Sequence, residues 1–203
     1  MIRIEMNARV SINAQDRGLS PSKETSLRPV PYSSRLQLVT TQGQVQIHTS
    51  SLRGSFSKVL SEALRSAGLG SKVLISQFLR GGVNQGPNGS INLCGQLEWI
   101  RPAIETCLPE QLPEEHLSLK RKYEEKAIKE LWEYCKKSLI EKNLDKIVLD
   151  EIGMAINLGF IEENDLISML NNRPSSTDII LTGQSIPPTV IEMADQITEL
   201  RCN

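Results

Sequence analysis

The sequence is poor in the residues that build metal sites. Its 2 histidines, His48 and His116, stand far apart, and none of its 4 cysteines has the Cys-X-X-Cys spacing. Zinc sites draw their ligands from closely spaced cysteine and histidine pairs, so we do not expect a zinc protein. Scattered cysteines are typical of reduced thiols in a cytoplasmic protein.

Long apolar stretches and an excess of one charge are also missing. No apolar run approaches the length that spans a bilayer, and residues 1–30 lack the apolar segment of a secretion signal. The formal net charge of -1 provides no basic footprint for nucleic acid. With 203 residues and 39% hydrophobic content, the chain is expected to form one globular domain in the cytoplasm.

Residues 1–43 are polar and proline-containing, and they show no sustained apolar periodicity. This composition is typical of a flexible arm, although Leu36–Val39 could pair as an edge strand. The arm is either a disordered tail or a segment that closes over a binding site, including a site on a partner subunit. We therefore predict a flexible N-terminal arm over residues 1–43 and a folded domain over residues 44–203.

Strand-like and helix-like patterns alternate from Gln44 onwards. Strands are predicted over residues 44–48, 72–78, 146–151, 178–183 and 197–200, and helices over 58–68, 114–142, 153–158, 162–171 and 189–194. Residues 81–113, rich in glycine and proline, are predicted to be irregular. The alternation predicts an α/β fold of three layers, with helices on both faces of a mainly parallel sheet. Ligands in such folds bind at the carboxyl ends of the strands.

The first predicted strand leads into the polar loop Thr49–Ser57 and then into a helix. This is the geometry with which α/β proteins hold phosphate, because the backbone N–H groups of the loop and the helix N-terminus point at the anion. The small residues Ser50, Ser51, Gly54 and Ser55 permit such a backbone turn. The pattern predicts a fold of the P-loop NTPase (RecA-like) type.

Asp150 and Glu151 directly follow an apolar strand, as in a Walker B segment whose carboxylate holds Mg²⁺. The alternative is that they cap the next helix, whose dipole favours negative charge there. Segments that begin at Gln77 and Thr182 also follow strands. We expect all of these segments to meet the Thr49–Ser57 loop at one edge of the sheet.

Several segments, taken in order and spacing, match the pattern of one known family. They are Ala63–Gly68, Val73–Gly81, Val148–Ile152, Asn172–Pro174, Leu181–Gly183 and Ala194–Leu200. With these segments the chain resembles the ATP:corrinoid adenosyltransferases of the BtuR/CobO/CobP type from about Val45 to Leu200. The resemblance implies transfer of the 5′-deoxyadenosyl group of ATP to Co(I) of a reduced corrinoid, with release of triphosphate. The cobalt is the nucleophile in that reaction, so the protein binds and positions its substrates and excludes water.

The resemblance also implies partners and site residues. ATP and a corrinoid would be the small-molecule partners, Mg²⁺ the cofactor, and a homodimer the possible assembly, with no nucleic acid or membrane involved. The triphosphate would lie against Ser50, Ser51, Leu52, Arg53, Gly54, Ser55, Phe56 and Ser57. Asp150 and Glu151 would hold Mg²⁺, and Arg80, Thr182, Gly183 and Gln184 would form the site edge. Leu97 and Trp99 would contact the corrinoid, although a core position for Trp99 is the alternative.

The loop departs from the family pattern. Ser55 stands where the family has the phosphate-binding lysine, Phe56 where it has the metal-binding hydroxyl, and Gln184 where it has an arginine. The first two changes remove charge-stabilising contacts to polyphosphate, each worth roughly 2–4 kcal/mol in a dry site. Two hypotheses therefore stand: an active adenosyltransferase, or a relative of the same fold that binds a nucleotide, corrinoid or protein without turnover.

Overall fold

The computed structural model describes residues 42–54, 56–82, 86–93, 95–110 and 119–201. Its elements in chain order are β1 (Val45–Ser50), α1 (Ser57–Gly68), β2 (Val73–Gln77), η1 (Pro87–Gly89), β3 (Ile91–Leu93), β4 (Leu97–Ile100), α2 (Leu119–Glu141), β5 (Lys146–Asp150), α3 (Ile152–Asn157), α4 (Glu163–Asn171), β6 (Asp178–Thr182), α5 (Pro188–Ile191) and β7 (Gln196–Leu200). The arm predicted for residues 1–43 lies almost wholly outside the described residues and stays a prediction.

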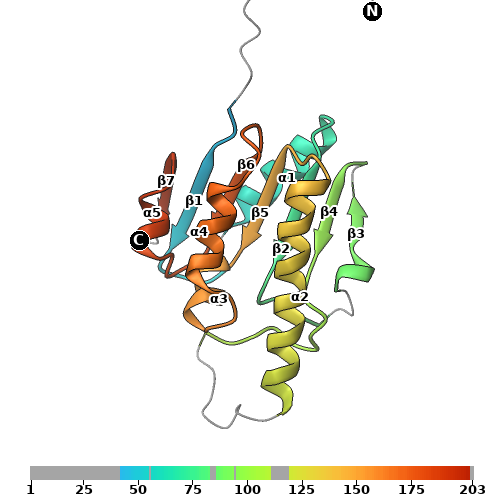
Figure 1. Cartoon of the computed structure of the whole chain (residues 1–203), viewed down its shortest axis with the longest axis vertical. Coiled ribbons are helices and arrows are strands. Elements are labelled where there is room, and N and C mark those ends of the chain that lie inside the picture. Colours follow the sequence, from blue (N-terminus) through green and yellow to red (C-terminus); the bar gives the residue numbers. More distant parts are fainter. Residues whose placement is uncertain (1–41, 55, 83–85, 94, 111–118, 202–203) are drawn as a thin grey trace, which may run out of the picture. The chain divides into compact units, whose positions relative to one another are not determined.

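The described strands form a seven-stranded sheet in the order β3-β4-β2-β5-β6-β1-β7. Every neighbouring pair is parallel except β3 and β4, which are antiparallel. Helices α2, α3 and α4 cover one face of the sheet, and α1 covers the opposite face (Figure 1). This arrangement confirms the predicted three-layer α/β fold with a mainly parallel sheet.

The central strands are buried on both faces, as their nearly continuous apolar sequences require. All residues of β2 are buried, as are the last four of β5 and of β6. The larger apolar cluster lies between the sheet and α2, α3 and α4, and a smaller one lies under α1. These packed strands hold their carboxyl ends rigidly, at the lower edge of the sheet in Figure 1.

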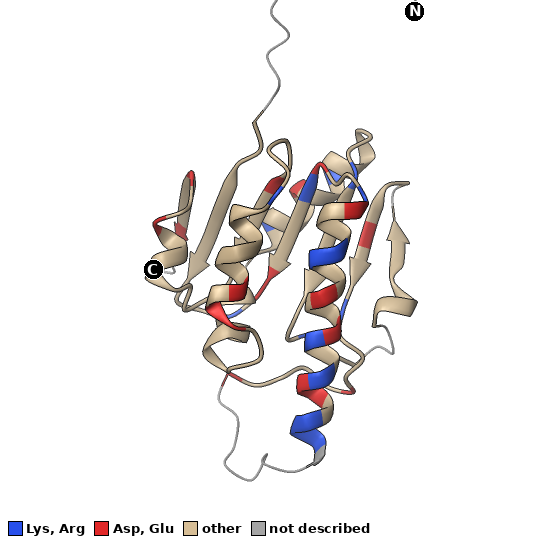
Figure 2. Ribbon diagram, viewed as in Figure 1, with Lys and Arg blue, Asp and Glu red and all other residues tan. Residues whose placement is uncertain are grey.

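The prediction of an irregular segment over residues 81–113 was wrong in part, because η1, β3 and β4 lie within it. All three residues of β3 are exposed, and β4 has only four residues, so neither strand has the long apolar pattern that marks a strand in sequence. The helix predicted from residue 114 is described from Leu119 onwards, and its outward face carries alternating charges (Figure 2). Among the described helices none is both long and apolar enough to cross a bilayer.

Candidate functional site

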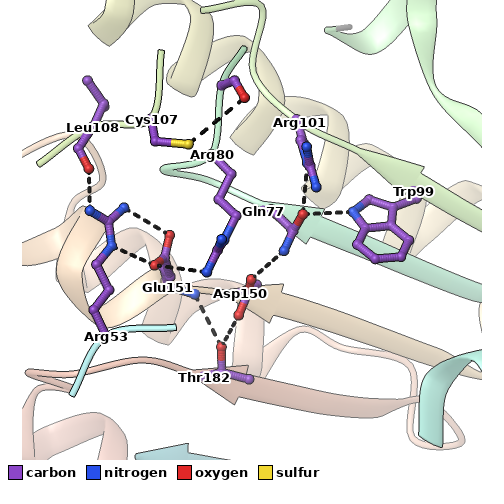
Figure 3. Close-up of polar contacts among 11 residues, drawn as sticks. Arg53, Gln77, Arg80, Trp99, Arg101, Cys107, Leu108, Asp150, Glu151 and Thr182 are labelled. Carbon is purple, nitrogen blue, oxygen red and sulfur yellow. Dashed lines mark hydrogen bonds and ion pairs between the residues drawn. The ribbon is translucent and has the colours of Figure 1, made fainter. Parts of the chain in front are cut away.

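Polar side chains from five segments meet at the carboxyl edge of the sheet (Figure 3). They come from the loop after β1, the end of β2 and the turn that follows it, the end of β4, the end of β5, and the end of β6. Since these strands are parallel neighbours, their ends lie side by side although the segments are far apart in sequence. The expected convergence of the loop with Asp150 and Glu151 is therefore present.

Arg53, from the loop after β1, forms a two-pronged ion pair with Glu151. The Arg53 Nε donates to Oε1 of Glu151 at 2.7 Å, and Nη2 donates to Oε2 at 3.2 Å. The remaining terminal nitrogen, Nη1, donates to the main-chain carbonyl of Leu108. The hydrogen bond to Glu151 raises the pKa of the Arg53 guanidinium, so Arg53 stays charged.

Arg80, from the turn after β2, brings a second guanidinium to the same carboxylate. Its Nη2 lies 3.9 Å from Oε1 of Glu151, and a Cβ placed on Gly54 would lie 2.9 Å from that nitrogen. The guanidinium thus rests directly on the Gly54 backbone. Its Nε is buried and has no hydrogen-bond partner among the described residues. We call Arg53 and Arg80 the guanidinium pair.

Glu151 is held in an unusual backbone conformation. Its φ is 61°, in the left-handed region, and its backbone N–H donates to Oγ1 of Thr182 at 3.2 Å. Gly183 lies against it, with φ of 129° and a hypothetical Cβ 3.1 Å from the Glu151 Cα. A non-glycine residue in this region costs roughly 1–2 kcal/mol, which packing must offset. In this backbone conformation the Glu151 carboxylate faces Arg53, while the Asp150 carboxylate faces Gln77 (Figure 3).

Asp150 is buried in a network of neutral donors. Thr182 Oγ1 donates to its Oδ1 at 2.6 Å, and Gln77 Nε2 donates to its Oδ2 at 2.7 Å. Burial raises the pKa of the Asp150 carboxyl, and the two hydrogen bonds oppose that rise. The network continues to β4, because Trp99 Nε1 and Arg101 Nε both donate to Oε1 of Gln77, at 3.0 and 2.8 Å. We call these five residues the Asp150 network.

The predicted corrinoid residues differ in burial but share one apolar cluster. Leu97 is fully buried in the cluster under α1, and Trp99 is half-buried, packs against the same cluster and belongs to the Asp150 network. The guanidinium carbon of Arg101 lies 5.9 Å from the centre of the Trp99 ring, where a cation–π attraction acts. The corrinoid roles of both residues stay predictions.

The loop after β1 is held by hydrogen bonds near its start. The hydroxyl of Ser50 accepts a hydrogen bond from the backbone N–H of Leu52 at 3.1 Å, and Nε2 of Gln184 donates to the carbonyl of Ser51 at 2.6 Å. Phe56 is buried in the cluster under α1 rather than facing the loop. Ser55 lies outside the described residues, and α1 begins at Ser57.

The carboxylates do not fit the Mg²⁺ that the resemblance implies. Both oxygens of Glu151 are bound by Arg53, and both oxygens of Asp150 are bound by Gln77 and Thr182. Within the described part of the chain, no three His, Cys, Asp or Glu residues are grouped to hold a metal ion. A guanidinium repels a cation about 4 Å away. The Coulomb energy of this repulsion is roughly 4 kcal/mol per unit of cation charge at an effective dielectric constant of 20.

Sequence reasoning missed three features of this site. Arg101 was not predicted at all, because it follows a strand without a long apolar run. Gln77 was noticed only as the start of a segment after a strand, although a polar residue that ends a wholly buried strand is a usable signal. The pairing of Arg53 with Glu151 spans 98 positions, and no local pattern reveals it.

The strand order, the loop between β1 and α1, and the carboxylates after β5 together define an α/β nucleotide fold of the phosphate-loop type. The family model of ATP:corrinoid adenosyltransferase BtuR/CobO/CobP matches residues 41–203. The chain therefore belongs to that family.

Similar proteins carry names that agree with this family. The corrinoid adenosyltransferase of Escherichia coli (strain K12) is 27% identical over 162 residues, which cover 79% of this chain and 77% of the relative. The corrinoid adenosyltransferase CobA of Salmonella typhimurium (strain LT2) is 26% identical over 160 residues, with the same coverage of 79% and 77%. The corrinoid adenosyltransferase of Pseudomonas aeruginosa is 23% identical over 166 residues, covering 78% of this chain and 75% of the relative.

Proposed function

We propose that the chain is a corrinoid adenosyltransferase, which transfers the 5′-deoxyadenosyl group of ATP to the cobalt of a reduced corrinoid. The Co(I) centre attacks C5′ of ATP, the C5′–O bond breaks, and its electron pair leaves with triphosphate. The cobalt is thereby oxidised to Co(III). Family membership supports this proposal over a non-catalytic relative.

The observation that carries the proposal is the guanidinium pair beside the phosphate-type loop. Arg53 lies in that loop and Arg80 rests on Gly54, so two positive charges replace the lysine that the loop lacks. Negative charge develops on the leaving triphosphate oxygen as the C5′–O bond breaks, and fixed positive groups stabilise it. We propose that ATP binds along Ser50–Ser57, with Thr182, Gly183 and Gln184 as the edge of the site.

The corrinoid is proposed to approach from the β4 side of the site. Trp99 and Arg101 lie there and are fixed through Gln77 to Asp150 (Figure 3). A half-buried indole held by a hydrogen bond offers a flat, apolar surface to a macrocycle at a low cost in side-chain entropy. Cytoplasmic location and assembly as a homodimer are further parts of the proposal. The free thiols of Cys107 and Cys135 agree with a reducing compartment.

The test is an anaerobic assay with purified protein, ATP, Mg²⁺ and chemically reduced cobalamin, followed by the absorbance change that accompanies formation of the cobalt–carbon bond. We expect adenosylated product, with an equal amount of triphosphate released. A matched control is Arg65→Gln, which removes an exposed arginine at the far end of α1 and should leave the rate unchanged. No product above background, while an active family member works in parallel, would favour the non-catalytic alternative.

A further inference from the structure

We infer that Arg53 takes the place of a divalent cation, so that the chain binds the triphosphate of ATP through guanidinium groups and not through a metal ion held by its own carboxylates. This inference rests on the proposed function, because it concerns how the same site holds its nucleotide.

The position of Arg53 supports the inference first. A loop that carries a phosphate between a strand and a helix normally faces a carboxylate that holds the cation, and here the guanidinium of Arg53 sits on that carboxylate. The pair is also well shielded, because the Glu151 side chain is 2% exposed and the Arg53 side chain 21%. A planar fork on a carboxylate is a specific arrangement and not a chance surface contact.

The guanidinium pair also has N–H donors that are free to bind triphosphate. Arg53 spends three of its five N–H groups on Glu151 and Leu108, which leaves one on each terminal nitrogen. Arg80 has no hydrogen bond within the described part of the chain, and its side chain is 36% exposed. The free Nη2 of Arg80 lies beside the Gly54 backbone, where the loop would turn around an anion.

The charge balance completes the argument. Glu151 contributes one negative charge between two guanidinium groups, so Arg53, Arg80 and Glu151 together carry a net charge of +1 (Figure 3). A divalent cation seated on Glu151 would have to displace Arg53 from both carboxylate oxygens. Glu151 therefore serves to position Arg53, and Arg53 serves to bind phosphate.

The first experiment measures binding of inorganic triphosphate to the full chain by calorimetry, once with EDTA and once with Mg²⁺. We expect binding with EDTA that is equal to, or tighter than, binding with Mg²⁺. Binding that is more than tenfold tighter with Mg²⁺, or absent under both conditions, would overturn the inference.

The second experiment uses Glu151→Gln, which keeps the side-chain shape and removes its charge. If Glu151 only positions Arg53, the variant changes triphosphate affinity by the same factor with EDTA and with Mg²⁺, because no cation takes part. If Glu151 holds a metal ion, affinity falls tenfold or more in Mg²⁺ and is unchanged with EDTA, and the inference is wrong. Glu130→Gln, at an exposed carboxylate of α2, is the matched control and should change nothing.

The third experiment replaces Arg53 by Gln and compares it with Arg65→Gln. We expect the Arg53 variant to lose at least tenfold in affinity with EDTA and to regain part of it with Mg²⁺, because Glu151 is then free to hold the cation. An unchanged affinity would contradict the inference. Thermal unfolding of each variant verifies that it is folded.

Failure of the inference can be told apart from failure of the proposed function. Metal-independent triphosphate binding without adenosyl transfer would leave the inference standing and remove the function. Adenosyl transfer by a protein whose triphosphate binding requires Mg²⁺ would support the proposed function and overturn the inference.

Discussion

Asp150 and Glu151 are neighbours in the chain, and the structure surrounds them with opposite kinds of partner. Asp150 is buried among neutral donors, a threonine hydroxyl and a glutamine amide, and burial raises its carboxyl pKa. Glu151 accepts from a guanidinium that is partly open to solvent. The difference indicates a division of labour: Asp150 holds the strand ends together, whereas Glu151 orients a charged group at the loop.

This comparison predicts that Asp150 contributes more to stability than Glu151. Asp150→Ala should lower the free energy of unfolding by about 2–4 kcal/mol, because the Thr182 hydroxyl and the Gln77 amide lose their buried acceptor and a small cavity remains. Urea unfolding measures the change. The control Glu130→Ala on α2 should alter stability by no more than about 0.5 kcal/mol. A loss below about 1 kcal/mol for Asp150→Ala would remove the structural role assigned to it.

Glu151→Ala should have a smaller effect on stability, about 1–3 kcal/mol. Removing one partner of a fully buried ion pair costs about 3–5 kcal/mol, but solvent can reach part of the Arg53 guanidinium and hydrate it. The same urea experiment provides the comparison. If Glu151→Ala destabilised the protein more than Asp150→Ala, the assignment of the main stabilising role to Asp150 would be wrong.

The two carboxylates can also be separated by pH, through comparison of the wild type with Asp150→Asn. Since burial raises the folded-state pKa of Asp150 above 3.8, its protonated form is the more stable in the folded protein. Its contribution to stability is fully present below pH 3.8 and is lost as the pH rises through the folded pKa. The destabilisation caused by Asp150→Asn should therefore be largest in acid and shrink towards neutral pH, by about 1.4 kcal/mol for each unit of pKa shift.

The pH experiment has an internal check. Thr182→Val removes a donor that opposes the rise in the Asp150 pKa, so the pH window in which the stability difference shrinks should move upwards. Denaturant midpoints between pH 3.5 and 7 would show this shift. A difference that is flat across that range would mean that the Asp150 carboxyl is not perturbed by its burial.

The fold was predictable because it depends on local patterns. Apolar runs such as Val73–Ile75 and Ile147–Leu149 identify buried parallel strands, and the helix periodicity between them restricts the architecture to an α/β sheet. Strands β3 and β4 were missed because three exposed residues and a four-residue segment do not produce such a pattern. Strand order also lies beyond the sequence pattern, since it depends on packing between distant segments.

The site was predictable in place but not in chemistry. Asp150, Glu151 and Thr182 follow apolar strands, so their common edge follows from topology. The ion pair between Arg53 and Glu151 could not be predicted from topology, because the partners are 98 positions apart and either residue could pair elsewhere. The burial of Phe56 under α1 was likewise hidden, since a residue at a helix start can turn inwards or outwards.

The smallest expected effects lie at the β4 end of the Asp150 network, where Trp99 and Arg101 share one acceptor. Trp99→Phe removes one donor to Oε1 of Gln77 and leaves the other, at 2.8 Å, so the loss of stability should be only about 0.5–1 kcal/mol. Arg101→Met should behave in the same way.

The double variant leaves the buried Oε1 of Gln77 without a donor. Gln77 cannot turn its amide over, because its oxygen would then face the Asp150 carboxylate. The double variant should therefore lose about 1 kcal/mol more than the sum of the single changes, measured by urea unfolding as a double-mutant cycle. Additivity within about 0.3 kcal/mol would show that Gln77 does not connect β4 to Asp150, and the contrast between the two carboxylates would then be confined to their nearest neighbours.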